Sequence, residues 1–333
     1  MNDTPALPRT AQPRTARPSW IPLAFGGLVL LVGLLAPLLA NDVPIAARVG
    51  GRWHFPAVAD CFGQASAGPD DLAWKQWWSR LPADSPDFVI MPLWPYGPIE
   101  TDSARFRAAP SVAHPFGNDD TGRDVLARLV HGASTAVTIG GPAVLLAGLL
   151  GTLLGALAGF RRGWIDVLVQ RLIELFMCFP TLMFLLFAAS FLGDSRMGLI
   201  LVMACTFWTS FARIVRGELL SLREREFVLV ARGLGVGEWR LLRRHLLPLA
   251  KGQIAVTAAF CMASAVTAES TLSFLGLAPG GSTVSWGTML RQGSELAHLG
   301  AWHLWLFPAA TIVAVVACCH VLADRWRAPG RAD

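Results

Sequence analysis

The sequence is poor in charged residues, and above all in lysine. Charged side chains make up 15% of its 333 residues, whereas an ordinary globular domain carries about 25%. Its two lysines are Lys75 and Lys251, and neither stands between a glycine and a serine or threonine. A phosphate-binding loop needs that arrangement, so we do not expect this chain to be an ATPase itself. The low charge also excludes an ordinary soluble protein of this size.

Cysteine is scarce as well, and its placement excludes two further classes of protein. The chain has six cysteines, and Cys61 is the one in a polar region. No CxxC pair occurs, so we predict neither a disulfide framework nor a thiolate metal site. His114, Asp119 and Asp120 also lack the spacing of a typical metal site. The other five cysteines lie in apolar runs: Cys178, Cys205, Cys261, Cys318 and Cys319.

Long hydrophobic runs make up much of the sequence. A membrane-spanning helix needs about 20 apolar residues, and six runs approach this length. They lie at about residues 21–40, 135–160, 172–191, 197–212, 253–275 and 302–323. We therefore predict an all-α polytopic membrane protein with six transmembrane helices. For the first run a cleaved secretory signal is the alternative, although a signal core is only about 7–15 residues long.

Basic residues divide unequally between the two sides of such a bundle. Eighteen lie in the termini and in the loops on their side, against ten opposite, of which eight belong to residues 41–134. Short loops carry the positive-inside signal, whereas long segments cross a membrane largely regardless of charge. We expect cytoplasmic tails at residues 1–20 and 324–333, an extracytoplasmic insertion at 41–134, and a core at 135–323. Membrane lipid, and not nucleic acid, then accounts for the net charge of +5.

Residues 213–251 are predicted to form a basic cytoplasmic loop that contains two short helices. An apolar stripe recurs at helical spacing from Phe227 to Leu234, through Val230 and Ala231. Glycines around Gly235 then permit a sharp turn, and a second helix is expected over residues 238–247, before a proline. A helix–turn–helix of this kind fits a groove in a partner protein. An amphipathic helix lying on lipid is the alternative.

This loop resembles the coupling loop of ATP-binding-cassette (ABC) import permeases. In that family Glu-Ala-Ala is followed by three residues, a glycine, nine residues, a hydrophobic position, any residue, and Leu-Pro. Here Leu229-Val230-Ala231 stands at the Glu-Ala-Ala position, so Leu229 replaces the glutamate and Val230 the first alanine. The resemblance implies that the loop docks on an ATPase. The docking residues would be Glu226, Leu229, Val230, Ala231, Gly235, Leu247 and Pro248.

Further stretches resemble the dipeptide and oligopeptide permeases. They are residues 114–128, which begin His-Pro-Phe-Gly, and residues 273–290, which include Ser-Trp-Gly-Thr-Met-Leu. Ala40-Asn41-Asp42-Val43-Pro44, Trp53-His54-Phe55-Pro56 and the long insertion resemble the Yej-type peptide permease subunit.

The resemblance implies a type I ABC importer permease fold in the bacterial inner membrane, with both termini cytoplasmic. It also implies a second homologous permease, two ATPases that use ATP and Mg, and an extracytoplasmic peptide-binding protein. This chain itself would hold no cofactor. An ATP-independent secondary transporter or channel is the alternative; it would be expected to show internal repeats or paired intramembrane charges, and neither is evident.

Three smaller features carry expectations of their own. Glu269 lies inside the fifth span, where a carboxylate is costly, so it is a functional candidate or a hydrogen-bond partner of a neighbouring helix. Asp120-Thr121-Gly122 matches an aspartic-protease triplet, but no second triplet occurs. We predict that Thr121 caps a helix instead. Gly151, Gly155 and Gly159 form a small-residue stripe that predicts close helix packing.

Overall fold

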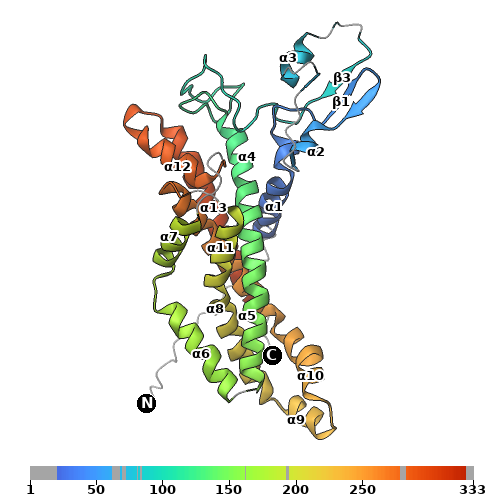
Figure 1. The fold of residues 1–333 in the computed structure, drawn as a ribbon, viewed down its shortest axis with the longest axis vertical. Helices are drawn as coiled ribbons and strands as arrows, with labels where there is room; N and C mark the ends of the chain where they lie inside the picture. The colour runs from blue at the N-terminus through green and yellow to red at the C-terminus, as the bar shows by residue number, and fades with distance from the viewer. Residues whose placement is uncertain are drawn as a thin grey trace, which may run out of the picture.

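The computed structural model describes residues 21–61, 68–69, 73–80, 82, 85–161, 163–192, 195–277 and 283–327. These residues form an elongated and mostly helical molecule (Figure 1). The helical bundle occupies the middle, the insertion after the first helix lies at one end, and α9 and α10 lie at the other. The predicted tail at 1–20 and the last six residues of the chain fall outside the described part.

Five helices are long and apolar enough to cross a membrane, and a sharply bent pair supplies a sixth span. The bent pair is α6 (Trp164–Met177) with α7 (Thr181–Leu192). The other five are α1 (Ile21–Leu39), the segment Val125–Arg161, α8 (Arg196–Arg223), the segment Glu238–Phe274, and α13 (Trp302–Arg327). The predicted helical fold with six spans is therefore confirmed when the bent pair counts as one span.

The second span begins earlier than the sequence predicts, at Val125 instead of Thr135. It consists of α4 (Val125–Thr135), a π-helical turn (Ala136–Gly140) and α5 (Gly141–Arg161). The sequence prediction started this span after the last charged residue that precedes the apolar run. That residue, Arg128, instead lies within α4 and is only 3% exposed. Its guanidinium is paired with the Asp119 carboxylate, and hydropathy alone does not register such a pairing.

The start of α4 corrects a second prediction, because Asp124 and not Thr121 caps this helix. The Asp124 carboxylate accepts a hydrogen bond from the Ala127 backbone N–H at 2.7 Å. Such an acceptor satisfies one of the free N–H groups at a helix start. The Thr121 hydroxyl donates instead to Asp119, at 2.9 Å, in the turn before the helix.

The third predicted span is not one continuous helix. Helices α6 and α7 meet at a bend of 81°. Pro180 stands directly before α7 and has no N–H to donate to a helical ladder. It also disfavours helical backbone at the residue before it, so the chain turns between Met177 and Thr181.

The two helices beside the cytoplasmic loop are longer than predicted. Helix α8 continues to Arg223, because Arg216 is neutralised by Asp166 of α6, with Nη2 and Oδ2 2.8 Å apart. The second loop helix does not end near Pro248. Instead α10 (Glu238–Leu241), a π-helical turn (Leu242–Leu246) and α11 (Leu247–Phe274) follow one another directly. The wider π turn accommodates the proline, which lacks a donor for the ladder.

The predicted glycine stripe does pack two spans closely. A Cβ atom at Gly155 would collide with the backbone of Ala212 in α8, and one at Gly159 would lie 3.0 Å from the Arg216 carbonyl oxygen. Gly151 likewise abuts the α8 backbone. Helices α5 and α8 therefore form a tight pair in the middle of the bundle, as small residues at regular spacing allow.

The insertion contains a small antiparallel sheet that the sequence did not predict. Its strand order is β2-β1-β3, with β1 (Ala46–Val49), β2 (Arg52–His54) and β3 (Phe88–Ile90). Gly50 and Gly51 both have positive φ, which permits the tight turn between β1 and β2. Two short helices accompany the sheet, α2 (Pro56–Cys61) and α3 (Trp74–Ser79).

Specific contacts tie the extracytoplasmic pieces to the bundle. The Trp94 indole N–H donates to Asp124 at 2.9 Å, which fastens the segment after β3 to the start of α4. On the other side of α4 lies α12 (Trp286–Glu295), whose Trp286 indole donates to the Leu129 carbonyl at 3.0 Å. These bonds join three separate stretches of the chain at the same end of the molecule.

Candidate docking site between α8 and α11

The loop between α8 and α11 is built on one buried anchor. Helix α9 (Glu226–Gly233) packs Val228, which is fully buried, against the bundle. Its neighbours in this apolar cluster include Leu219 and Leu222 of α8 and Leu241 of α10. The sequence pattern missed Val228, because the stripe drawn from Phe227 to Leu234 placed it off the apolar face.

Gly235 forms the turn that ends α9, as its place in the sequence predicted. Its φ of +77° lies in the left-handed region, which side chains with a Cβ rarely adopt. The Gly235 N–H donates to the Arg232 carbonyl at 2.9 Å, and the Val236 N–H donates to the Ala231 carbonyl at 3.1 Å. These two bonds make a Schellman motif, which satisfies the free carbonyl groups at a helix end.

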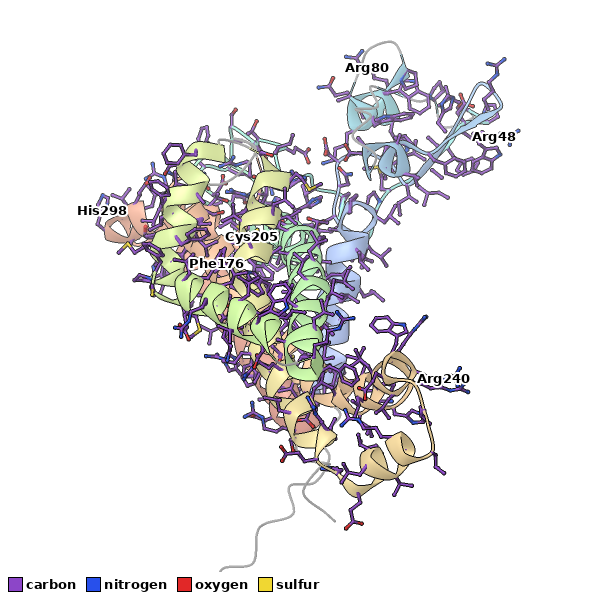
Figure 2. The ribbon with its side chains drawn as sticks, turned by 60° about the horizontal axis from the view of Figure 1, so that its bottom comes forward. Arg48, Arg80, Phe176, Cys205, Arg240 and His298 are labelled. Atoms are coloured by element: carbon purple, nitrogen blue, oxygen red, sulfur yellow. The ribbon has the colours of Figure 1, made fainter. Side chains whose placement is uncertain are left out.

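An ion pair fixes α9 relative to α10 across this turn. Arg232 Nε lies 3.0 Å from Glu238 Oε1, and Nη2 lies 3.3 Å from Oε2. Figure 2 shows the loop standing apart from the bundle, at the opposite end from the labelled Arg48 and Arg80 of the insertion. The turn, the buried anchor and the ion pair together hold α9 and α10 in one defined geometry.

The predicted docking residues divide into outward-facing and inward-facing groups. Leu229 is 57% exposed and Val230 is 61% exposed, and Leu234 beside the turn is 80% exposed. Ala231 and Leu247 instead pack against the buried cluster. Glu226 and Pro248 are exposed, at the start of α9 and of α11 respectively. The outward-facing residues thus include two exposed apolar side chains next to the Gly235 turn, and we call Val230 and Leu234 the apolar docking face.

Glu269 is a buried side chain with partners and does not belong to the loop. It is 3% exposed, in the part of α11 that lies towards α12. The Ser273 hydroxyl donates to Glu269 Oε1 at 2.7 Å, and Ser270 lies 3.5 Å from Oε2. Ser285, the cap of α12, also bonds the carboxylate. This arrangement agrees with a hydrogen-bonding role between helices, one of the two roles expected from sequence.

A second charged cluster lies where the insertion meets α4. Asp119 accepts hydrogen bonds from Arg123 Nε at 2.7 Å and from Arg128. Burial raises the pKa of Asp119, but the two guanidinium groups outweigh this effect, so its pKa lies below the usual range. Among the described residues, no group of His, Cys, Asp and Glu side chains has the arrangement of a metal site. Asp119 therefore acts as the counter-ion of a buried arginine.

Comparisons with known proteins identify the family. Residues 151–328 match the model of the binding-protein-dependent transport system inner membrane component. A Brucella suis biovar 1 protein, provisionally named a peptide permease, is 38% identical over 242 residues, which are 72% of this chain and 80% of that protein. The oligopeptide transport system permease OppC of Bacillus subtilis is 36% identical over 218 residues, 66% of this chain and 71% of OppC.

A second Bacillus subtilis relative and a solved structure complete the comparison. The dipeptide transport system permease DppC is 34% identical over 237 residues, 71% of this chain and 74% of DppC. The MetNI methionine ABC transporter, in an inward-facing conformation, has a chain that this fold matches with a TM-score of 0.50 at 18% identity. The match covers 61% of this chain and 97% of that chain, and it shows the fold alone. The chain thus belongs to the family of inner membrane components of binding-protein-dependent transport systems.

Proposed function

We propose that this chain is one of two homologous permease subunits of an ABC importer for peptides. The names of the relatives support the peptide substrate, since they include dipeptide and oligopeptide permeases. The chain has no phosphate-binding loop, so ATP and Mg belong to two separate ATPase subunits. An extracytoplasmic peptide-binding protein completes the proposed assembly. A secondary transporter or channel, the alternative, is not favoured by the family.

The observation that carries the proposal is the apolar docking face of the loop. Val230 and Leu234 are exposed on a segment that is anchored by Val228 and ended by the Gly235 turn. Exposed apolar side chains on an ordered helix are costly in water unless a partner covers them. A short helix that presents such a face fits a groove of a partner protein. We assign this partner as the ATPase.

The proposed mechanism passes force along one helix. The segment Glu238–Phe274 runs from the docking loop into the bundle as one helical rod. Its α-helical hydrogen bonding is interrupted by the π turn alone. Closure of the ATPase dimer would move the loop, and α11 would carry the movement to the substrate path. Binding of ATP can drive this change only because it favours one of the two states over the other.

The orientation of the chain is also part of the proposal. The distribution of basic residues supports a cytoplasmic location for the loop and both tails. Two contacts within the bundle support the placement of both ends of the described chain on the same side of the membrane. Cys318 Sγ donates to the Pro22 carbonyl at 3.0 Å, and Ala323 packs with Val256 and Ala259 in the loop-proximal half of α11.

Copurification tests the docking proposal directly. A double variant, Val230→Asp with Leu234→Asp, should insert normally but lose the ATPase subunit, because two carboxylates cannot be buried in an apolar groove without great cost. The matched control is Val112→Asp, whose residue is fully exposed on the insertion side. If the double variant retains the ATPase as well as the control does, the docking face is assigned wrongly.

A further inference from the structure

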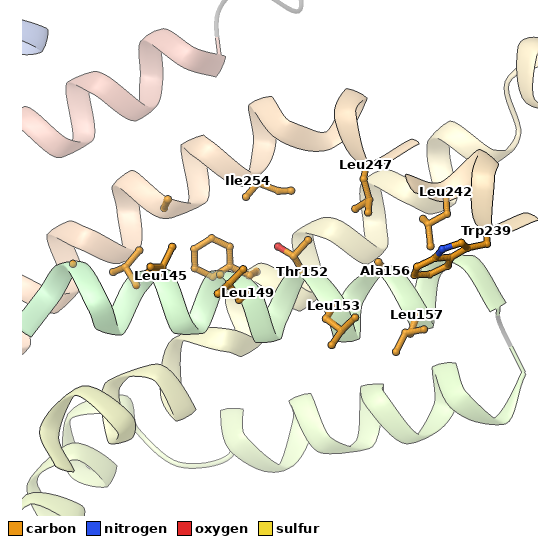
Figure 3. Close-up of a pocket in the computed structure, with 15 residues that line it drawn as sticks. Leu145, Leu149, Thr152, Leu153, Ala156, Leu157, Trp239, Leu242, Leu247 and Ile254 are labelled. Atoms are coloured by element: carbon orange, nitrogen blue, oxygen red, sulfur yellow. The ribbon is translucent and has the colours of Figure 1, made fainter. Parts of the chain in front are cut away.

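A long apolar groove runs along the outside of α5. It has a volume of about 760 Å³ and lies between α5, α8, α10 and α11. Figure 3 shows Leu149 and Thr152 of α5 and Ile254 of α11 along it, with Trp239 across its loop-proximal end. Thr152 is the one lining residue of α5 that bears a hydroxyl, and the other lining residues of that helix are aliphatic or glycine.

The groove runs along most of α5. It extends from Gly141 to Leu157, which at a rise of about 1.5 Å per residue is about 24 Å. This length exceeds the roughly 15 Å of one leaflet but stays within the roughly 30 Å of the whole hydrocarbon core. Because its lining is almost wholly apolar, the groove can take acyl chains that lie along α5.

A basic pocket lies beside the loop-proximal end of the groove. This second pocket, of about 360 Å³, is lined by Trp239, Arg240, Arg243 and Arg244. Trp239 lines both spaces, so the two are neighbours. All three arginines are exposed, and none forms an ion pair with another described residue. The nearest acid in sequence, Glu238, is already paired with Arg232.

We propose that the groove and the basic pocket bind an anionic phospholipid of the cytoplasmic leaflet. Its acyl chains lie along α5, and its phosphate is held by Arg240, Arg243 and Arg244. Trp239 sits between the two parts, at the depth where tryptophan side chains concentrate in membranes. An apolar helix from another subunit would leave the three guanidinium groups without counter-ions. The assignment to this leaflet rests on the orientation proposed above.

Native mass spectrometry of the complete transporter tests this proposal. The complex is purified in detergent, and phosphatidylglycerol or phosphatidylcholine is added. Arginines near a membrane surface each favour anionic lipid by about fivefold, so replacing all three by Gln should lower the preference for phosphatidylglycerol by roughly 100-fold. Replacing all three by Lys should retain it. Leu149→Trp, which fills the groove, should lower retention of both lipids, whereas Val313→Trp on α13, with an equally exposed residue, should not.

Three results would overturn the proposal. The first is equal retention of phosphatidylglycerol and phosphatidylcholine by the unmodified complex, and the second is an unchanged preference in the Gln variant. The third is a cross-link from Leu153→Cys, in the groove wall, to the second permease in a complex that retains no lipid. Copurified ATPase is counted in the same spectra, so loss of the ATPase, which would contradict the docking proposal, is read separately from loss of lipid.

Discussion

The Gly235 turn provides the sharpest test of how the loop works. Proline has φ fixed near −65°, whereas Gly235 has φ of +77°. Proline also lacks the N–H that Gly235 donates to Arg232, so Gly235→Pro removes both the turn and its hydrogen bond. Alanine keeps the N–H but adds a Cβ, which in the left-handed region costs about 1–2 kcal/mol. Nothing lies within 4 Å of that Cβ, so the cost is backbone strain alone.

These differences predict a graded loss of coupling. Gly235→Pro should leave membrane insertion intact, because the turn lies outside the spans, but should uncouple ATP hydrolysis from peptide uptake. Gly235→Ala should reduce uptake by about 5- to 30-fold if the strained turn is needed in every cycle, since about 1–2 kcal/mol corresponds to such a ratio. Gly235→Asn should be milder, because asparagine tolerates left-handed backbone.

Uptake of labelled dipeptide and ATPase activity in proteoliposomes measure the two halves of this coupling. Gly237→Ala is the matched control, since Gly237 lies two residues away with φ of −58° and open space around it. It should behave like the unmodified protein. Normal uptake by Gly235→Pro, at normal abundance in the membrane, would refute the assignment of this turn as part of the coupling device.

The remaining predictions concern packing, charge and the family pattern. Gly155→Val should lower the thermal midpoint strongly because its side chain meets the α8 backbone, whereas Gly141→Val, with open space, should change it little. Asp119→Asn should destabilise the protein by about 3–5 kcal/mol at pH 7, because it leaves Arg128 buried and unpaired. The Asp119 pKa is lowered on folding, so this contribution is present above about pH 4 and is lost as the pH falls through the folded pKa. Thermal midpoints of the two proteins should converge over that acid range. Leu229→Glu should leave ATPase copurification unchanged, because the residue is exposed and glutamate is the family residue at this position.

Hydrophobic length and arginine placement predicted the spans, but not how each begins, bends or ends. Arg128 and Arg216 lie inside helices whose predicted bounds, 135–160 and 197–212, left them out. Arg128 is neutralised by Asp119 in the turn before α4, and Arg216 by Asp166 of α6. A hydropathy window assigns each arginine the full free-energy cost of burying a charge in an apolar environment. It does not register the ion pair that lowers this cost.

The loop between α8 and α11 was predicted in its position and turn, and less well in its packing. Gly235 could be identified because only glycine tolerates the backbone that a sharp helix end requires. Val228 could not, since its burial depends on contacts with Leu241 and Leu246 across the turn. A periodic stripe identifies an apolar face but does not say whether that face packs inward or outward. In α9 most of the stripe points outward, although Ala231 packs inward, and Val228 beside the stripe is the anchor.

The continuity of α10 with α11 has a mechanical consequence. The segment Glu238–Phe274 has 37 residues, which at about 1.5 Å each make a rod of about 55 Å. Its π turn at Leu242–Leu246 is the one place along it where the ladder is widened, directly above the docking loop. At the far end, Glu269 is bonded to Ser285 at the cap of α12, which is packed on α4 through Trp286. A tilt imposed on the loop is therefore either absorbed at the π turn or delivered to α12, some 40 Å away along the helix. Deleting one of its residues would convert the π turn into α-helix, because the wide turn holds one extra residue, and the helix beyond it would keep its register. Such a variant should retain the ATPase but alter the amount of peptide taken up per ATP hydrolysed in proteoliposomes. An unchanged ratio would show that the π turn absorbs no part of the tilt.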